Sequence, residues 1–292
     1  MRQFTITLFI TLLIILCSAF TRGIRTGGSG SDMTEQVSTA VIDNSVVQVF
    51  YQLRRVYDSL IPDKRVEQST MILQIGESGI SKFFTDNRVR DSINRVRAAT
   101  AQSVEVAGRI VGAAVSSFNP RSAEIVFKNW PKGSITVTDL VGMRHDLYSY
   151  TEPSPEIEWQ ILPDIETILS YSCQKAVTTF RGRNYEAWFA PDIPINEGPW
   201  KFCGLPGLVL KVSDTRQHYI FECVGLEQVK APIEYSNLGY IKTTREELAI
   251  FKQREAEDPY AFSGMAAPTL INGVNYSQLY PNLNPPYNPI EL

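Results

Sequence analysis

The segment Gly198–Leu210 constrains the fold more than any other part of the sequence. It holds three glycines and two prolines, and an uninterrupted apolar run follows them. Because proline fixes φ and glycine permits positive φ, Gly204-Leu205-Pro206-Gly207 is expected to form a tight, rigid bend. The run Leu208–Val212 is typical of a strand with most of its side chains buried. The segment therefore predicts a corner that leads directly into a core strand, and this concerns folding rather than activity.

Most of the chain after residue 45 consists of strand-like runs. In the first of them, residues 46–57, apolar and polar side chains alternate, as in a strand with one buried face. Most loops are short and carry Gly, Pro, Asn or Asp, as antiparallel meanders require, and there is no βαβ alternation. The fold is therefore expected to be mainly β (α+β), with a curved antiparallel sheet. The expected strands are 46–57, 69–75, 81–85, 123–130, 134–140, 145–151, 156–162, 167–180, 184–189, 208–213 and 218–224.

Two helices are expected among the strands. Apolar side chains recur every three or four positions over residues 86–117, which predicts an amphipathic helix. Its apolar side has small residues and no Trp or Phe, so packing on the sheet is favoured over a membrane-surface role. Thr244-x-x-Glu247 is a capping box that opens a C-terminal helix over residues 245–256, and a proline-rich, extended arm follows. This order resembles the half-barrel of periplasmic lipoprotein carriers (LolA-like proteins).

Further strings on either side of the bend carry a family resemblance. Upstream lie Tyr171-Ser172-Cys173-Gln174-Lys175-Ala176, Phe180-Arg181-Gly182-Arg183, the aromatic pair Trp188-Phe189 and Pro191-Asp192-Ile193-Pro194-Ile195, and Asn288-Pro289-Ile290-Glu291-Leu292 ends the sequence. Together with the bend, they resemble the GLPGLI family of exported Gram-negative cell-envelope proteins. The family name has Ile where this chain has Val209. The resemblance implies a cellular location and a fold, but no activity, because the family has no assigned function.

Residues 1–19 are expected to be a cleaved signal peptide. Arg2 gives a positive start, the apolar run over residues 6–16 is too short for a comfortable membrane span, and Ser18-Ala19 supplies small residues for cleavage. A lipoprotein acylated at Cys17 is the alternative, although Leu16 stands where a small residue is usual. We therefore expect a protein secreted to the periplasm or cell envelope, without a transmembrane span in the mature chain. The expected parts are a flexible segment 20–45, an antiparallel β domain 46–230 with the helical insert, and a C-terminal helix and arm 231–292.

The net charge and the number of cysteines limit which partners the chain could bind and which disulfides it could form. The net charge of −3 gives no electrostatic reason to bind nucleic acid. Without Cys17, three cysteines remain, an odd number for an oxidising compartment. Cys173 and Cys223 lie in expected strands and form the more plausible disulfide pair, which leaves Cys203 as a free thiol. Three buried, unpaired cysteines that act as small apolar side chains fit equally well.

The sequence contains no residues with the spacing of a catalytic or metal site. His145 and His218 are the two histidines, and neither Cys-x-x-Cys nor His-Glu-x-x-His occurs. Gly-x-Ser-x-Gly, the nucleophile turn of many hydrolases, is also missing. Cys203 and His218 could form a nucleophile–base pair, but no orienting partner is evident. We therefore expect no catalytic residue, no metal and no cofactor.

The candidate binding residues gather around the bend. Arg181 and Arg183 flank a glycine, and from a tight turn both guanidinium groups could grip one carboxylate or phosphate. The alternative is an internal salt bridge to Glu186 or Asp192. Large aromatics near the proline-rich connection either pack in the core or build the mouth of an apolar pocket. The candidates are Arg181, Arg183, Trp188, Trp200, Gly204, Pro206 and Gly207.

These observations favour a non-enzymatic exported protein that binds an apolar or peptide-like ligand or an envelope partner. This interpretation rests on the expected export, the β meander, the amphipathic helix and the lack of a catalytic pattern. Two alternatives stay open. One is an accessory factor of an outer-membrane transporter, with an outer-membrane protein as partner, and the other is a thiol- or histidine-dependent hydrolase that uses Cys203 and His218.

Overall fold

The computed structural model describes residues 38–57, 59, 66–85, 124–141, 146–257, 262 and 287–292 of the chain. The chain divides into two compact units, residues 1–35 and 36–292, and every described residue belongs to the second. The expected signal peptide, the expected helix over residues 86–117 and His145 lie outside the described residues. Within the described parts of the chain, no helix has the length and apolar character that a membrane crossing requires.

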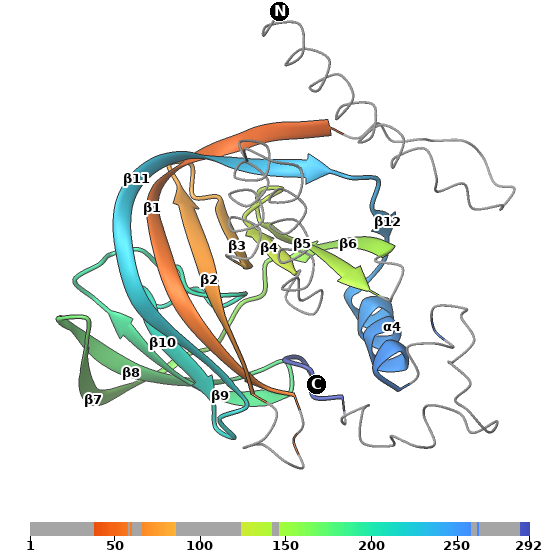
Figure 1. The fold of residues 1–292 in the computed structure, drawn as a ribbon. Coiled ribbons are helices and arrows are strands. Elements are labelled where there is room, and N and C mark those ends of the chain that lie inside the picture. The colour runs from red at the N-terminus through yellow and green to blue at the C-terminus, as the bar shows by residue number, and fades with distance from the viewer. Residues whose placement is uncertain are drawn as a thin grey trace, which may run out of the picture. The chain divides into compact units, whose positions relative to one another are not determined.

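Twelve strands form one open, curved sheet in the order β12-β6-β5-β4-β3-β2-β1-β11-β10-β9-β8-β7 (Figure 1). Neighbouring strands are antiparallel except β12 and β6, which are parallel. The expected mainly β class with a curved antiparallel sheet is therefore confirmed. The strands are β1 (Ser38–Val56), β2 (Val66–Gly76), β3 (Ser81–Thr85), β4 (Ile125–Lys128), β5 (Ser134–Val141), β6 (Asp146–Pro153), β7 (Gln160–Ile168), β8 (Tyr171–Phe180), β9 (Arg183–Ala190), β10 (Leu208–Asp214), β11 (Tyr219–Asn237) and β12 (Ile241–Lys242).

Irregular pairing between β1 and β11 accounts for much of the curvature. These two strands, each of 19 residues, lie side by side and bend together (Figure 1). Their register shifts between Val41 and Asp43, again before Val47, and again between Phe50 and Tyr51. An extra residue in one strand of an antiparallel pair bends that strand and increases its twist. The shifts therefore curve the sheet at its centre.

Two hydrophobic cores lie on opposite faces of the sheet. Leu73 and Phe83 belong to the larger core, whereas their neighbours Ile72 and Phe84 belong to the smaller one. Because successive side chains of a strand point to opposite faces, the two cores are separated by the sheet. We call the face with the larger core the inner face. Residues from the bend, from the C-terminal helix and from the end of the chain also pack into this core, among them Phe202, Leu205, Leu248 and Ile290.

The expected C-terminal helix is confirmed as α4 (Arg245–Glu257). Its capping box forms as expected, since Glu247 N–H donates to Thr244 Oγ1 at 3.1 Å and Thr244 N–H donates to Glu247 Oε2 at 3.1 Å. Leu248 is buried, and the ring of Phe251 lies 5.4 Å from that of Tyr148 on β6. α4 therefore packs on the inner face beside β5 and β6.

Several strand boundaries differ from the sequence-based expectation. The strand expected over residues 167–180 is two strands, because Leu169 and Ser170 take φ angles of 48° and 73° and form the turn between β7 and β8. Neither residue is a glycine or proline, so no turn signal marked the position. β1 begins at Ser38, inside the segment expected to be flexible, and β11 runs to Asn237, well beyond residue 224.

Candidate functional site

The expected bend forms, and its glycines have different reasons to be glycine. Gly204 has φ of 92° and open space around it, so it supplies a backbone conformation. Gly207 permits close packing, because a Cβ there would lie 2.3 Å from the carbonyl oxygen of Ala190. Leu205 is buried between the exposed Gly204 and Pro206. The structure therefore places the candidate binding residues Gly204, Pro206 and Gly207 at a sharp corner of the chain.

A buried lysine on β4 holds the strand connection that contains the bend. Lys128 Nζ donates to the carbonyl oxygens of Gly198 and Phe202, at 2.7 and 3.2 Å, and pairs with the carboxylate of Glu197. Ser81 Oγ on β3 donates to the same carboxylate at 3.1 Å. These bonds fold the connection back over the inner face. Sequence reasoning missed Lys128, because a lone lysine in a strand pattern carries no sign of burial.

The turn between β8 and β9 forms, but its two arginines do not share a ligand. Arg181 and Gly182 have φ of 49° and 79°, which is typical of a tight hairpin turn. Arg181 Nη2 lies 3.0 Å from Glu152 Oε2, and Arg183 Nη1 lies 3.1 Å from Asp214 Oδ2. Both arginines therefore have internal partners, and these are neither Glu186 nor Asp192.

The last described residues of the chain, 287–292, lie on the inner face and are held there by their main chain. We call them the 287–292 segment. Tyr219 Oη donates to the carbonyl oxygen of Asn288 at 2.5 Å, Arg183 Nε to that of Pro289 at 3.0 Å, and Tyr185 Oη to that of Ile290 at 3.0 Å. Leu292 N–H donates to the carbonyl oxygen of Arg181 at 2.9 Å. Buried donors on β9 and β11 thus bind three successive carbonyl groups.

The side chain of Asn288 fixes the position of the segment along this row of donors. Arg183 Nη2 donates to Asn288 Oδ1 at 2.7 Å, and Asn288 Nδ2 donates to the carbonyl oxygen of Val56 at 2.7 Å. Val56 is the last residue of β1. The segment is therefore tied to the central strands of the sheet as well as to the hairpin of β8 and β9.

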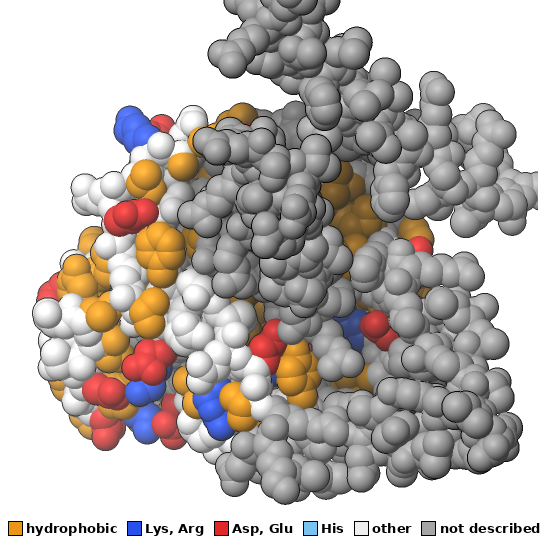
Figure 2. All heavy atoms as spheres, in the orientation of Figure 1, with side chains coloured by type: hydrophobic (Ala, Val, Ile, Leu, Met, Phe, Trp, Pro, Cys, Tyr) orange, Lys and Arg blue, Asp and Glu red, His pale blue; other side chains and the backbone are white. Residues whose placement is uncertain are grey.

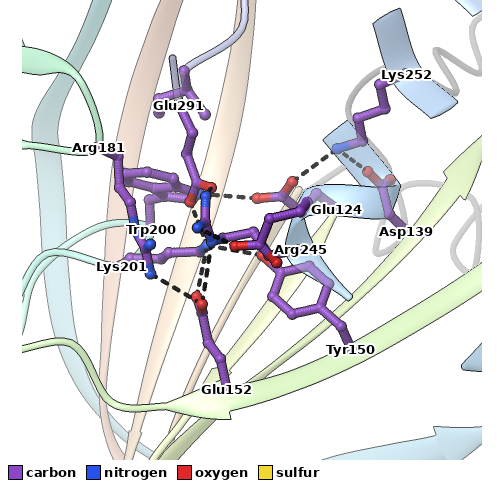
Figure 3. A network of polar contacts seen from close by, with 12 residues as sticks. Glu124, Asp139, Tyr150, Glu152, Arg181, Trp200, Lys201, Arg245, Lys252 and Glu291 are labelled. Carbon is purple, nitrogen blue, oxygen red and sulfur yellow. Dashed lines mark hydrogen bonds and ion pairs between the residues drawn. The ribbon is translucent and has the colours of Figure 1, made fainter. Parts of the chain in front are cut away.

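The side chain of Glu291 enters a pocket of buried charges (Figure 3). Lys201 Nζ pairs with Glu291 Oε1, lies 3.3 Å from Glu152 Oε1 and donates to Tyr150 Oη at 2.8 Å. Arg245 Nη1 lies 3.5 Å from Glu291 Oε2, and Arg245 Nε lies 3.3 Å from Glu152 Oε2. The Lys201 side chain is 1% exposed. We call Tyr150, Glu152, Arg181, Lys201 and Arg245 the carboxylate pocket.

A second group of charges ties α4 to the sheet next to this pocket (Figure 3). Lys252 lies between two carboxylates, with its Nζ 3.1 Å from Glu124 Oε2 and paired with Asp139. Trp200 Nε1 donates to Glu124 Oε1 at 2.9 Å. Burial acts to raise the pKa of both carboxyl groups. At Glu124 the charges of Lys252 and Lys201 and the hydrogen bond from Trp200 outweigh burial, so its pKa is lowered. At Asp139 burial outweighs Lys252, so its pKa is raised. The group positions α4, whose first residue, Arg245, is part of the carboxylate pocket.

The two candidate tryptophans do not form one platform. Trp200 is buried in the larger core, with its ring centroid 5.3 Å from that of Phe202 and 5.9 Å from that of Phe180. Trp188 is half-buried on β9 between the buried Ala187 and Phe189, and it packs against the margin of the larger core. Lys175 Nζ lies 5.7 Å from the ring centroid of Trp188.

The described cysteines are free thiols with raised pKa values. Cys173, Cys203 and Cys223 are all free, which agrees with the alternative of three unpaired cysteines and not with a disulfide between Cys173 and Cys223. Their strands, β8 and β11, are separated by β9 and β10, and a disulfide needs Cα atoms within about 7 Å. Burial raises the pKa of Cys203, against the lowering effect of Lys128, whereas a thiol nucleophile needs a lowered pKa. The structure therefore gives no support to a pair of Cys203 with His218.

The described parts of the chain contain no cluster of metal ligands. There, no group of three or more His, Cys, Asp or Glu side chains is placed to hold a metal ion. On the described part of the face that Figure 2 shows, Lys and Arg side chains are interspersed with Asp and Glu, and no extended basic surface is visible. The carboxylate pocket and the 287–292 segment are therefore the strongest candidate site among the described residues.

Comparisons with known proteins point to a family without an assigned role. A family model described as "Protein of unknown function (Porph_ging)" matches residues 180–211, which run from the end of β8 through β9 and the bend into β10. No curated protein matches the chain. Two solved structures of PNGF-II, in space groups P21 and C2, are similar at 13% and 15% identity, with TM-scores of 0.46 and 0.44. In both cases the match covers 70% of this chain but 32% of the solved one, so this chain spans about a third of the length of these structures.

Proposed function

We propose that the protein is a non-enzymatic binding protein of the cell envelope that holds an extended, peptide-like segment on the inner face of its curved sheet. The observation that carries this proposal is the binding of three successive carbonyl groups by Tyr219, Arg183 and Tyr185. Bonds to main-chain groups do not depend on the side chains of the ligand, and peptide-binding domains use them for affinity. In this chain the 287–292 segment occupies the site.

The donors are built into the sheet, which supports a site that exists before its ligand arrives. Arg183, Tyr185 and Tyr219 are buried residues of β9 and β11, and Arg183 is oriented by its ion pair with Asp214. Asp214 Oδ1 in turn accepts a hydrogen bond from Tyr219 N–H at 2.7 Å. Donors that are already fixed lose little conformational entropy when they bind a segment.

The cellular location and the family relationship are also part of the proposal. The expected signal peptide and the resemblance to the GLPGLI family support export to the periplasm or cell envelope. The family model that matches residues 180–211 has no assigned function. In that compartment, the segment bound at this site would belong to a peptide or to an envelope partner such as an outer-membrane protein.

Exchange of the bound segment tests the proposal. A protease site is placed between residues 258 and 286, the folded full chain is cleaved, and a fluorescent Tyr-Asn-Pro-Ile-Glu-Leu peptide is added. Saturable binding, measured by fluorescence anisotropy, is expected because the peptide competes with the cleaved segment. The double variant Tyr185→Phe/Tyr219→Phe keeps both rings but removes two donors, so it should bind at least about tenfold more weakly.

A peptide with the same residues in reversed order serves as the control. Equal binding of both peptides, or no binding by the cleaved and still folded protein, would argue against the proposal. Native mass spectrometry of the protein from its own envelope gives an independent measurement. A retained peptide mass is the expected result, whereas a retained lipid would favour the apolar-ligand alternative.

A further inference from the structure

We infer that the segment bound at this site must carry a carboxylate, so that the ligand class is an acidic, extended peptide. This inference rests on the proposed function and adds the chemistry that selects the ligand. The carboxylate pocket receives the side chain one residue beyond the carbonyl group that Tyr185 binds. In this chain that side chain is Glu291.

Lys201 has a full set of hydrogen-bond acceptors only when the bound segment supplies one of them. An ammonium group has three N–H donors, and Lys201 directs them to Tyr150, Glu152 and Glu291. Its side chain is 1% exposed, so water does not replace a missing acceptor at low cost. A segment without an acceptor at this position would leave a buried cation with one unsatisfied donor.

The charges in the pocket also favour a carboxylate on the bound segment. Three cations, Arg181, Lys201 and Arg245, converge on the single carboxylate of Glu152, at 3.0, 3.3 and 3.3 Å. The mostly exposed Glu246 pairs with Arg245 at the rim. Glu291 therefore supplies the second carboxylate that pairs with both Lys201 and Arg245, and a neutral segment would leave the buried Lys201 and the partly buried Arg245 with less compensation.

The two carboxylate oxygens of Glu291 have different cationic partners. Oε1 pairs with Lys201 and Oε2 lies 3.5 Å from Arg245 Nη1, so each oxygen faces a different cation. A carboxylate offers acceptors at both positions, whereas an amide would turn a donor toward one of the cations. The pocket therefore discriminates glutamate from glutamine, and not simply polar from apolar side chains.

The pocket also links the ligand to four parts of the fold, of which the turn between β8 and β9 supplies Arg181. Lys201 belongs to the connection that contains the bend, Arg245 begins α4, and Tyr150 and Glu152 belong to β6 (Figure 3). A carboxylate bound there completes the contacts between these parts. An acidic segment should accordingly stabilise the position of α4 as well as occupy the site.

Peptide competition on the cleaved full chain tests the inference. Three peptides are compared by fluorescence anisotropy: Tyr-Asn-Pro-Ile-Glu-Leu and the same sequence with Gln or Lys at the fifth position. We expect the Gln peptide to bind at least tenfold more weakly than the Glu peptide, and the Lys peptide to show no measurable binding. Free glutamate at millimolar concentration should not displace the Glu peptide, because it lacks the main chain that the sheet binds.

Variants of the pocket show whether it causes the preference. Lys201→Met should abolish the difference between the Glu and Gln peptides. Because Lys201→Met risks misfolding, Arg245→Gln is the second variant, since the Arg245 side chain is 24% exposed. Arg245→Gln should reduce the difference in affinity between the Glu and Gln peptides at least threefold. Lys175→Met, outside the pocket, should leave the difference unchanged.

The outcomes separate the inference from the proposed function. If the Glu and Gln peptides bind equally well, the inference is wrong while the peptide-binding function stands. If no peptide binds to the folded, cleaved protein, the proposed function fails and the inference with it. A preference for Glu that survives both pocket variants would also overturn the inference, because another part of the protein would then select the carboxylate.

Discussion

At the scale of single residues, buried cations organise the inner face. Lys128, Arg183 and Lys201 are all buried, and each contacts both a carboxylate and another oxygen acceptor. Charged side chains of this kind are rarely buried unless they are paired. Each of them joins segments that are far apart in the sequence, so the fold and the candidate site depend on the same contacts.

The ion pair of Arg183 with Asp214 should be much more important for stability than an exposed pair of similar length. Its side chains are 4% and 2% exposed, and Arg183→Met would leave Asp214 as an unpaired buried charge. We expect the free energy of unfolding in urea to fall by about 3–5 kcal/mol. Lys175→Met is the matched control, because Lys175 and Glu186 pair at 3.0 Å but are 20% and 41% exposed. Its cost should stay below about 1 kcal/mol, and equal costs would show that burial is not the cause.

The thiol of Cys203 should be unreactive at neutral pH. Burial raises its pKa, and it raises that of Cys223 to about 11, so both thiols are protonated at pH 7. Because the thiolate is the reactive form, alkylation by iodoacetamide should be slower in the folded protein than in the unfolded chain and should accelerate only above pH 9. Mass spectrometry of each cysteine over a pH series measures this. If Cys203 reacted faster in the folded protein than in the unfolded chain, the result would support the alternative of a thiol-dependent hydrolase.

At the scale of elements, the bend depends on close packing more than on backbone freedom. Gly207→Ala would place a Cβ 2.3 Å from the carbonyl oxygen of Ala190, which neither strand can relieve without moving. We expect a loss of about 3 kcal/mol in the free energy of unfolding. Gly204→Ala is the control, because φ of 92° costs about 1–2 kcal/mol but no atom beyond the two neighbouring residues of the chain lies within 4 Å of the added Cβ. Thermal unfolding of both variants compares them, and a larger loss at Gly204 would contradict the packing argument.

Elements with a local signal were predictable from the sequence, and those without one were not. The capping box at Thr244 and the glycines around the bend predicted α4 and β10, because caps and turns are recognised by neighbouring residues. The turn at Leu169 and Ser170 carries no glycine or proline and was missed. The length of β11 was missed too, because its second half is held by pairing with β1, which is distant in the sequence.

At the scale of the whole molecule, the candidate site was harder to predict from the sequence than the single elements were. Arg181 and Arg183 were identified from their turn, but their partners Glu152 and Asp214 were not, because no local pattern relates them. The carboxylate pocket takes its residues from β6, the turn between β8 and β9, the connection that contains the bend, and α4, and Glu291 enters it from the 287–292 segment. Only the curvature of the sheet brings these parts together, so the sequence shows the residues and not the site.

Removal of residues 288–292 should therefore destabilise the whole sheet domain. The shortened chain loses Glu291 from Lys201 and three carbonyl acceptors from buried donors, so we expect a loss of at least about 3 kcal/mol. For a domain of this size that corresponds to a fall in Tm of roughly 10 °C. Deletion of Leu292 alone is the control: its side chain is 65% exposed and it gives one main-chain hydrogen bond, so the loss should stay below about 1.5 kcal/mol.

Addition of free Tyr-Asn-Pro-Ile-Glu-Leu to the shortened chain distinguishes a ligand site from a simple structural contact. A ligand that binds only the folded state raises Tm as its concentration increases above its Kd. The peptide should therefore recover part of the lost Tm in a saturable way, and its Gln counterpart should recover less at the same concentration. If the shortened chain unfolds at the temperature of the full chain, the 287–292 segment contributes nothing to the fold. If the peptide leaves Tm unchanged, the donors of β9 and β11 do not accept a segment from outside the chain.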